Sequence, residues 1–363
     1  MAGEGAGDGS DRLRLIRTPG VGPVTYRQLI ARFGTAAAAI EALPTLARRG
    51  GGNAPAVPDA RLVAREMAAT AQFGARYVFL GAPDYPALLA ELDSAPPALI
   101  VRGDMALTQA PCVALVGARN ASAAACRFAR GLAHELAAGG VTVVSGLARG
   151  IDTAAHGGAM PRTIGVIASG IDVVFPPENA ALQEDVARAA LLIAEQPPGT
   201  QPLARNFPSR NRIIAGLAIG TVVVEAAPRS GSLITARLAN EAGREVMAVP
   251  GSPIDPRAQG CNLLIREGAT LIQTAADVLE QIRPIDPRAV RAPSAGYGAP
   301  PPADASDHER AAVLSLLGPV AAPVDELIRQ SGLAPAVVQT VLLELELAGR
   351  LERHAGGRVS LNG

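Results

Sequence analysis

Between residues 76 and 282, short apolar runs alternate with longer stretches in which apolar residues recur at a helical period. Runs this apolar are typical of strands buried on both faces, and the stretches between them are long enough to connect parallel strands. The pattern predicts an α/β fold with a doubly wound, mostly parallel sheet that binds ligands beyond the carboxyl ends of its strands. We interpret as strands residues 77–80, 113–116, 141–145, 163–168, 191–195, 221–225 and 245–249, and as connecting helices 123–138, 178–190 and 232–242.

The N-terminal part has a different pattern. Residues 1–10 are small and acidic, which predicts a disordered tail, and residues 11–75 predict a small helical domain (SAM-like or helix-hairpin-helix-like). Its glycine-rich turn at 18–23 resembles a helix-hairpin-helix turn, which offers backbone N–H groups to a DNA phosphate, although an ordinary interhelical turn fits equally well. The residues that make one apolar helix face are Tyr26, Leu29, Ile30 and Phe33.

Residues 283–306 are rich in proline and lack apolar periodicity, which predicts an extended linker. Residues 307–363 then follow the order of a winged helix, with helices and a closing hairpin. The expected recognition helix has no arginine before Arg350, so it is poorly equipped to hold phosphates, and we favour a protein contact for this domain. The segments are helices at 309–317, 324–330 and 334–348 and strands at 350–353 and 358–361; the polar residues of the third helix include Gln339, Thr340, Glu344 and Glu346.

The amino-acid composition excludes several classes of chemistry. All 33 basic residues are arginine, which excludes an internal lysine Schiff base and a lysine-containing phosphate loop. The net charge is zero, so a polyanion must be held by local arginine clusters. The three cysteines are too few and too widely spaced for a disulfide framework, and the four histidines show no metal-ligand spacing. With neither a signal peptide nor a membrane span in view, we expect a cytoplasmic protein without cofactor or metal.

Two neighbouring loops are suited to anions. After strand 113–116, Gly117 lets the backbone approach an anion and Arg119 adds a forked donor at a helix start. A dinucleotide site would need further glycines, and an arginine paired with an acid is the structural alternative. After strand 141–145, Gly146 and Arg149 belong to a second glycine-bracketed loop that can form an anion nest.

The second loop also admits a catalytic interpretation. Ser145, Asp152 and His156 have the residue types of a nucleophile, an orienting acid and a base. The strained G-x-S-x-G elbow is absent, and an aspartate near a helix start usually caps the helix. We therefore favour a capping and loop-bracing role for Asp152.

A third loop combines cations with an aromatic ring, which is the combination that single-stranded nucleic acid binding requires. The alternative is that the ring is a hydrophobic staple and that the arginines pair with Glu195 and Glu225. In a fourth loop, Ser230 and Gly231 can cap a helix or receive a phosphate. The residues of the third loop, within 202–217, are Arg205, Phe207, Arg210 and Arg212.

Taken together, these motifs resemble the DNA-processing protein A family, also called DprA or Smf, over about residues 113–273. The resemblance implies an extended Rossmann-like domain that dimerises, binds single-stranded DNA without sequence preference and helps to load the RecA recombinase during natural transformation, with no catalytic activity. The motifs are Val-Gly-Ala-Arg (116–119), Ser-Gly-Leu-Ala-Arg-Gly-Ile-Asp (145–152), Phe-Pro-Ser-Arg-Asn-Arg-Ile-Ile-Ala-Gly-Leu (207–217), Ser-Gly-Ser-Leu-Ile-Thr-Ala (230–236), Val-Pro-Gly (249–251) and Gly-Cys-Asn-Leu-Leu-Ile (260–265).

The resemblance also assigns a DNA-binding pocket. Ala118 stands where the family often has Ser or Thr, so one hydroxyl donor to phosphate is missing. The residues expected to bind DNA are Gly117, Arg119, Ser145, Gly146, Arg149, Phe207, Arg210 and Arg212, together with Ser230 and Gly231 of the fourth loop.

Two rival functions remain open. Rossmann-like nucleoside-monophosphate phosphoribohydrolases use a P-G-G-x-G-T-x-x-E loop, but residues 229–235 lack its glycine pair and glutamate. A nucleotide-sensing module, whose winged helix transmits binding to a partner protein, is the other rival.

Overall fold

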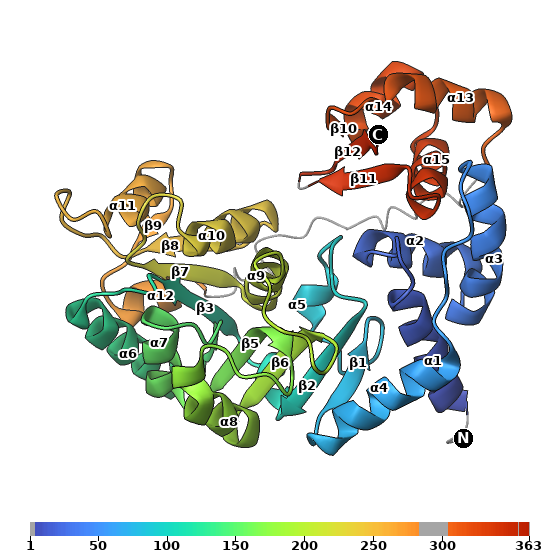
Figure 1. The fold of residues 1–363 in the computed structure, drawn as a ribbon. Coiled ribbons are helices and arrows are strands. Elements are labelled where there is room, and N and C mark those ends of the chain that lie inside the picture. The colour runs from blue at the N-terminus through green and yellow to red at the C-terminus, as the bar shows by residue number, and fades with distance from the viewer. Residues whose placement is uncertain (1–3, 283–303, 355, 363) are drawn as a thin grey trace, which may run out of the picture. The chain divides into compact units, whose positions relative to one another are not determined.

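The computed structural model describes residues 4–282, 304–354 and 356–362. The chain forms two compact units, one of Arg65–Arg291 and one that combines Met1–Ala64 with Ala292–Gly363. The sequence predicts three separate folded pieces, whereas in the structure the two terminal domains pack together as one unit. Figure 1 shows the elements of both units.

The larger unit contains a nine-stranded sheet in the order β1-β2-β6-β5-β4-β3-β7-β8-β9. Strands β1 and β2 pair antiparallel with each other, and β2 pairs antiparallel with β6. All other pairs are parallel, which confirms the predicted α/β class and mostly parallel sheet. The strands are β1 (Arg76–Phe79), β2 (Ala98–Gly103), β3 (Cys112–Gly117), β4 (Thr142–Ser145), β5 (Thr163–Gly170), β6 (Leu191–Gln196), β7 (Gly220–Val224), β8 (Glu245–Ala248) and β9 (Thr270–Leu271).

Helices cover both faces of this sheet (Figure 1). Alternate residues of β3 point to opposite faces, so Val113 and Leu115 pack with α6, α7 and α12, whereas Ala114 and Val116 pack with α5, α9, α10 and α11. Helix α8 covers β2 and β6. The helices are α5 (Ala87–Ala90), α6 (Ala123–Ala138), α7 (Ile151–Ala159), α8 (Ala180–Ala189), α9 (Asn206–Leu217), α10 (Gly231–Glu241), α11 (Gln259–Arg266) and α12 (Ala275–Gln281), with short 3₁₀ helices at Met105–Gln109 and Pro177–Asn179.

The terminal unit is built from helices and a three-stranded sheet in the order β10-β12-β11. Its C-terminal part is the predicted winged helix. Helix α4 (Ala60–Gln72) runs across the boundary between the two units. The other elements are α1 (Glu4–Ile16), α2 (Pro23–Phe33), α3 (Ala36–Arg49), α13 (Asp307–Leu316), α14 (Val324–Ser331), α15 (Pro335–Leu347), β10 (Ala322–Pro323), β11 (Leu351–His354) and β12 (Arg358–Leu361).

The predicted disordered tail at residues 1–10 is wrong from Glu4 onward, because α1 begins there. Leu13 and Leu15 anchor this helix in the core, and an ion pair between Arg12 and Asp8 joins successive turns at 2.7 Å. Most of the predicted linker, residues 283–303, lies outside the described residues. At its described end, Asp304 pairs with Arg32 and with Arg49, so this end is tied to the helical domain.

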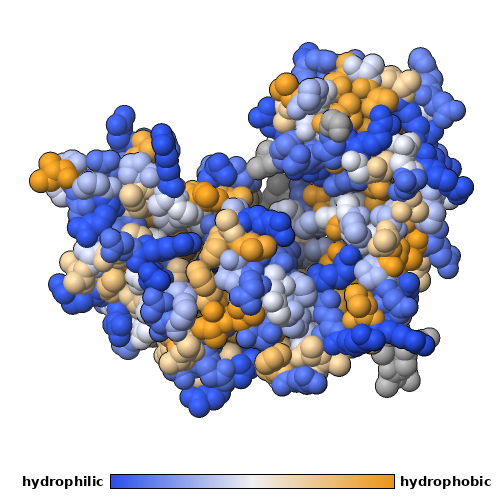
Figure 2. All heavy atoms as spheres, viewed as in Figure 1, coloured by the Kyte–Doolittle hydropathy of each residue, from blue (hydrophilic) through white to orange (hydrophobic). Residues whose placement is uncertain are grey.

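The surface drawn in Figure 2 mixes hydrophilic and hydrophobic residues. In the described part of the chain, no single helix is both long and apolar enough to cross a bilayer, and one bent pair, α2 with α3, meets the criterion by length and composition only.

Candidate functional site

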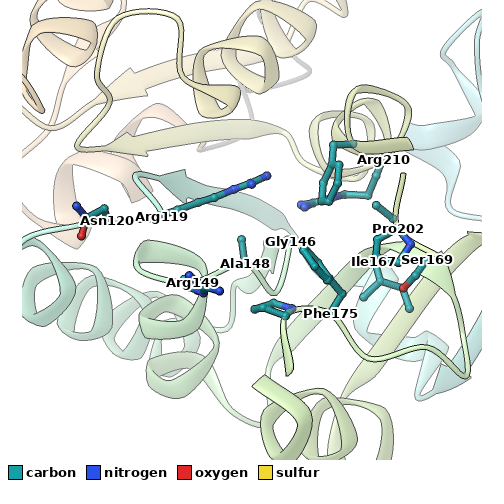
Figure 3. A pocket seen from close by; sticks show the side chains of 13 residues that line it. Arg119, Asn120, Gly146, Ala148, Arg149, Ile167, Ser169, Phe175, Pro202 and Arg210 are labelled. Carbon is teal, nitrogen blue, oxygen red and sulfur yellow. The ribbon is translucent and has the colours of Figure 1, made fainter. Parts of the chain in front are cut away.

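A cavity of about 330 Å³ lies at the carboxyl edge of the sheet, where β4 and β5 end. Its walls come from the end of β5, from the loops after β3, β4, β5 and β6, and from α9. Figure 3 shows Arg119 and Arg210 extending toward each other from opposite sides of this cavity. The residues that line it are Arg119, Asn120, Gly146, Ala148, Arg149, Ile167, Ala168, Ser169, Phe175, Pro176, Pro202, Phe207 and Arg210.

A second cavity of about 640 Å³ adjoins the first. It lies between the loops that follow β3 and β7, where the strand order reverses and where open α/β sheets bind their ligands. Ser230 and Gly231 line it at the start of α10, together with Gly117 and Arg257. Five residues line both cavities and form the wall between them: Arg119, Asn120, Ala148, Phe207 and Arg210.

Two glycines make room for this arrangement. A Cβ on Gly117 would lie 1.9 Å from the carbonyl oxygen of Val224, so no other residue fits between β3 and β7 there. A Cβ on Gly146 would lie 1.5 Å from Nη1 of Arg210. The glycine of the second loop therefore allows the guanidinium group of Arg210 to lie directly against the backbone.

Two cations lie close to the aromatic ring of Phe207. The Arg119 guanidinium is 5.1 Å from the ring centroid and that of Arg210 is 6.0 Å from it. Phe175 meets the same ring edge to face at 5.9 Å. The sequence reasoning misses Phe175, although it follows β5 just as Phe207 follows β6, and it is 41% exposed. The site therefore offers two rings as well as two guanidinium groups.

Burial gives Arg210 an unusual environment. Its side chain and that of Asp152 are each only 6% exposed. Burial lowers the pKa of Arg210 and raises the pKa of Asp152, while the attraction between the two opposite charges opposes both shifts. An arginine stays protonated in proteins, and Nε of Arg210 has no hydrogen-bond partner. A buried positive charge with an unused donor is therefore held at the wall of both cavities.

The structure brings most of the predicted DNA-binding residues together. Gly117, Arg119, Gly146, Arg149, Phe207, Arg210, Ser230 and Gly231 all line one or both cavities. The exposed Arg149 also pairs with Glu178 at 2.9 Å.

Ser145 and Arg212 line neither cavity. The Ser145 hydroxyl is fully buried and donates to the carbonyl oxygen of Leu115 at 2.7 Å. Arg212 points away and pairs with Glu195, as the alternative interpretation of this loop expects. A DNA contact by either residue stays a prediction.

The three residues of the hypothetical catalytic triad are not arranged as a relay. Asp152 accepts from the backbone N–H of Ala148 at 3.2 Å, which agrees with the loop-bracing role. The predicted capping role is wrong, because the N-cap of α7 is Gly150 and no side chain caps that helix. His156 contacts Thr163 at 2.7 Å, and because the Thr163 hydroxyl donates to Val143, Nδ1 of His156 is the donor. Ser145 hydrogen-bonds to Asp152, but His156 bonds to Thr163 instead of to either of them, so the base of a relay is missing.

Two of the three cysteines are buried. Burial raises the pKa of the Cys261 thiol to about 11 and that of Cys112 to about 12, so both thiols stay protonated at neutral pH. No group of three or more His, Cys, Asp or Glu residues among the described positions is arranged to hold a metal ion.

The buried His156 predicts a pH dependence of stability. Burial and nearby Arg210 lower its pKa to about 3, whereas an unfolded histidine titrates near 6.5. As pH falls below about 6.5 the unfolded state takes up a proton that the folded state refuses, so the free energy of unfolding decreases by up to about 1.4 kcal/mol per pH unit. His156→Asn removes this proton uptake, so the dependence of the free energy of unfolding on pH should become less steep by up to about 1.4 kcal/mol per pH unit. Urea titrations between about pH 6 and pH 4 measure it.

Comparing wild type with His156→Asn isolates the contribution of His156, because both proteins keep Asp152. The raised pKa of Asp152 changes the pH dependence in the opposite direction. The Asp152 carboxyl binds its proton more readily in the folded state, so its contribution to the free energy of unfolding increases as pH falls. His134→Asn, at an exposed position of α6, is the matched control. Equal slopes for wild type and His156→Asn would contradict the prediction.

The fold and cavities define a Rossmann-like domain with an anion-accepting site at the carboxyl edge of its sheet, attached to a helical domain and a winged helix. Three family models match the chain: DNA recombination-mediator protein A at residues 76–283, the DprA-like N-terminal HHH domain at 7–69, and the DprA winged helix domain at 298–357. The chain belongs to the DNA recombination-mediator protein A family.

Individual relatives agree with this assignment. The chain is 46% identical to DNA processing protein DprA of Streptococcus pneumoniae over 204 residues, which is 54% of this chain and 71% of that protein. The X-ray structure of that protein superposes with a TM-score of 0.56 at 40% identity, covering 62% of this chain and 78% of the other. DNA processing protein A from Helicobacter pylori, known for a unique single-stranded DNA binding mode, superposes with a TM-score of 0.52 at 29% identity, covering 56% and 94%.

Proposed function

We propose that this protein binds single-stranded DNA without sequence preference at the two adjoining cavities. The observation that carries the proposal is the position of Phe207, whose ring has the Arg119 and Arg210 guanidinium groups 5.1 and 6.0 Å from its centroid in the wall that both cavities share. A base can stack on an aromatic ring whatever its identity, and guanidinium groups hold the phosphates on either side. Backbone N–H groups at the start of α10 add a further phosphate position.

The family supports a wider role. Because the chain resembles DNA processing proteins over its Rossmann-like domain and both flanking domains, we infer that it acts as a cytoplasmic homodimer. In that role it protects incoming DNA and helps to load RecA recombinase during natural transformation or recombination. The proposed activity is binding and remodelling of a nucleoprotein complex, with no bond made or broken.

Fluorescence anisotropy tests the binding proposal. Short labelled oligonucleotides, single-stranded and duplex, are titrated with wild-type protein over a salt series. We expect tighter binding to the single strand, because a duplex keeps its bases stacked and away from Phe207, and we expect affinity to fall as salt rises. Absence of single-strand binding by folded protein would overturn the proposal.

The two rival functions have their own readouts in the same samples. Release of a free base from a nucleoside monophosphate would favour the phosphoribohydrolase. Saturable binding of a mononucleotide that DNA does not displace would favour the nucleotide-sensing module.

A further inference from the structure

The third helix of the winged domain, α15, packs against the helical domain at the other end of the chain. Leu343 and Leu347 of α15 are each 3% exposed and share one apolar core with Leu29 of α2 and Leu43 of α3. In a DNA-reading winged helix this third helix is the element that enters the major groove. Here its C-terminal half is instead buried within the same chain.

Two of the three consecutive glycines at 50–52 permit this contact. A Cβ on Gly50 would lie 2.1 Å from the carbonyl oxygen of Glu344, and one on Gly52 would lie 2.5 Å from that of Ala348. Neither glycine has the positive φ that would require glycine for conformational reasons; Gly50 has φ −74° and ψ −1°, which any residue adopts. The end of α3 therefore lacks side chains because the backbone of α15 lies there.

The acidic residues of α15 bond both to the helical domain and within the winged domain. Glu346 is 13% exposed; it accepts from the Thr25 hydroxyl at 2.7 Å and from Nε of Arg353 at 2.8 Å. Glu344 is 1% exposed and accepts hydrogen bonds from Nε and Nη2 of Arg310, at 2.8 and 3.0 Å.

Two further bonds cross the contact directly. The amide of Gln28 donates to Gln339 at 3.0 Å, and Nη1 of Arg350 donates to the carbonyl oxygen of Gly50 at 3.2 Å. Gln339 and Glu346, two of the polar residues that make α15 a poor phosphate binder, thus serve its contact with the helical domain, whereas Glu344 pairs with Arg310 of its own domain.

We propose that α15 is an internal docking helix, which binds the helical domain of its own chain and withdraws one surface of that domain from DNA. This surface is the side of the helical domain next to the turn at 18–23. There Thr25, in the first turn of α2, donates to the Glu346 carboxylate, and Gly20 lies against the backbone of Glu346. A DNA phosphate and Glu346 are both anions and compete for that helix start, so DNA reaches it only when α15 undocks.

Gly50→Ala and Gly52→Ala, made singly in the full chain, test docking without changing any charge. A methyl group at either position meets the backbone of α15, so we expect hydrogen exchange of the α15 amides to accelerate by about 5- to 150-fold, as overpacking of a tight contact implies. Exchange in α1 should stay slow, which shows that the helical domain remains folded. Gly318→Ala is the matched control, because a Cβ there meets nothing within 4 Å and no left-handed φ is involved.

DNA binding is then measured in a chain that also carries Arg119→Ala and Phe207→Ala, so that binding gained comes from the terminal unit and the result stands apart from the cavity proposal. We expect Gly50→Ala to raise the affinity for labelled DNA, and Glu346→Gln to raise it in the same direction. Unchanged exchange in Gly50→Ala and Gly52→Ala would overturn the docking. Faster exchange without any gain in DNA affinity would overturn the withdrawal of a DNA-binding surface.

Discussion

Replacement of Phe207 by alanine is expected to weaken single-stranded DNA binding by about 5- to 150-fold, which corresponds to the loss of about 1 to 3 kcal/mol of base stacking. The ring carries no charge, so the slope of log affinity against log salt should stay as in wild type. Anisotropy titrations at several salt concentrations measure both quantities. The ring is only partly buried, with Phe175 and the two arginines as its neighbours, so its removal leaves the hydrophobic core intact.

Conservative variants of Phe207 distinguish base stacking on the ring from filling of space by an apolar side chain. Phe207→Tyr keeps a ring and should bind nearly as wild type, whereas Phe207→Leu keeps apolar volume without a π-face and should resemble the alanine variant. If Phe207→Leu binds as tightly as wild type, the ring fills space and does not stack on a base. A parallel loss of salt slope in Phe207→Ala would show that the substitution displaces the neighbouring guanidinium groups.

The hydrophobic pattern predicts most of the fold because it reports burial directly. Strands buried on both faces are continuous apolar runs, so seven strands are found near their observed positions. Three connecting helices, α6, α8 and α10, are found as well, and α6 matches the prediction at both ends. Strand β9 has only two residues, too few to show any period, and β2 follows two prolines that favour a loop interpretation. The packing of the terminal domains against each other depends on contacts more than 300 residues apart, which no local pattern encodes.

The site is predicted less completely, because helical phase decides which side chains reach it. Arg210 and Arg212 are two residues apart on α9, so they point about 200° apart around the helix. Arg210 faces the cavities and Arg212 faces Glu195 of β6, but the sequence treats both as equivalent cations next to Phe207. Phe175 is missed for a related reason: its loop joins the site only when β5 and β6 lie side by side.

Arg119→Ala should lower single-strand affinity by about 10- to 150-fold, the range that corresponds to a charge-assisted hydrogen bond of about 1.5 to 3 kcal/mol. The salt slope should decrease by about 0.7, the value for one phosphate contact on a single strand. Arg119 is exposed and has no ion-pair partner among the described residues, so its removal leaves no buried acid uncompensated. Arg210 is less suitable for this substitution, because its loss would leave the buried Asp152 without a compensating positive charge and destabilise the fold.

The matched control is Arg188→Ala, which removes the same charge from α8 at a side chain that is 74% exposed and lines neither cavity. It should change affinity only slightly, because an arginine remote from bound DNA contributes through the screened field alone. An unchanged salt slope in Arg119→Ala would show that this guanidinium contacts no phosphate. Combined with Phe207→Ala, Arg119→Ala tests whether the two groups act together: because the guanidinium lies on the ring at 5.1 Å, the double variant should lose less than the sum of the two single losses.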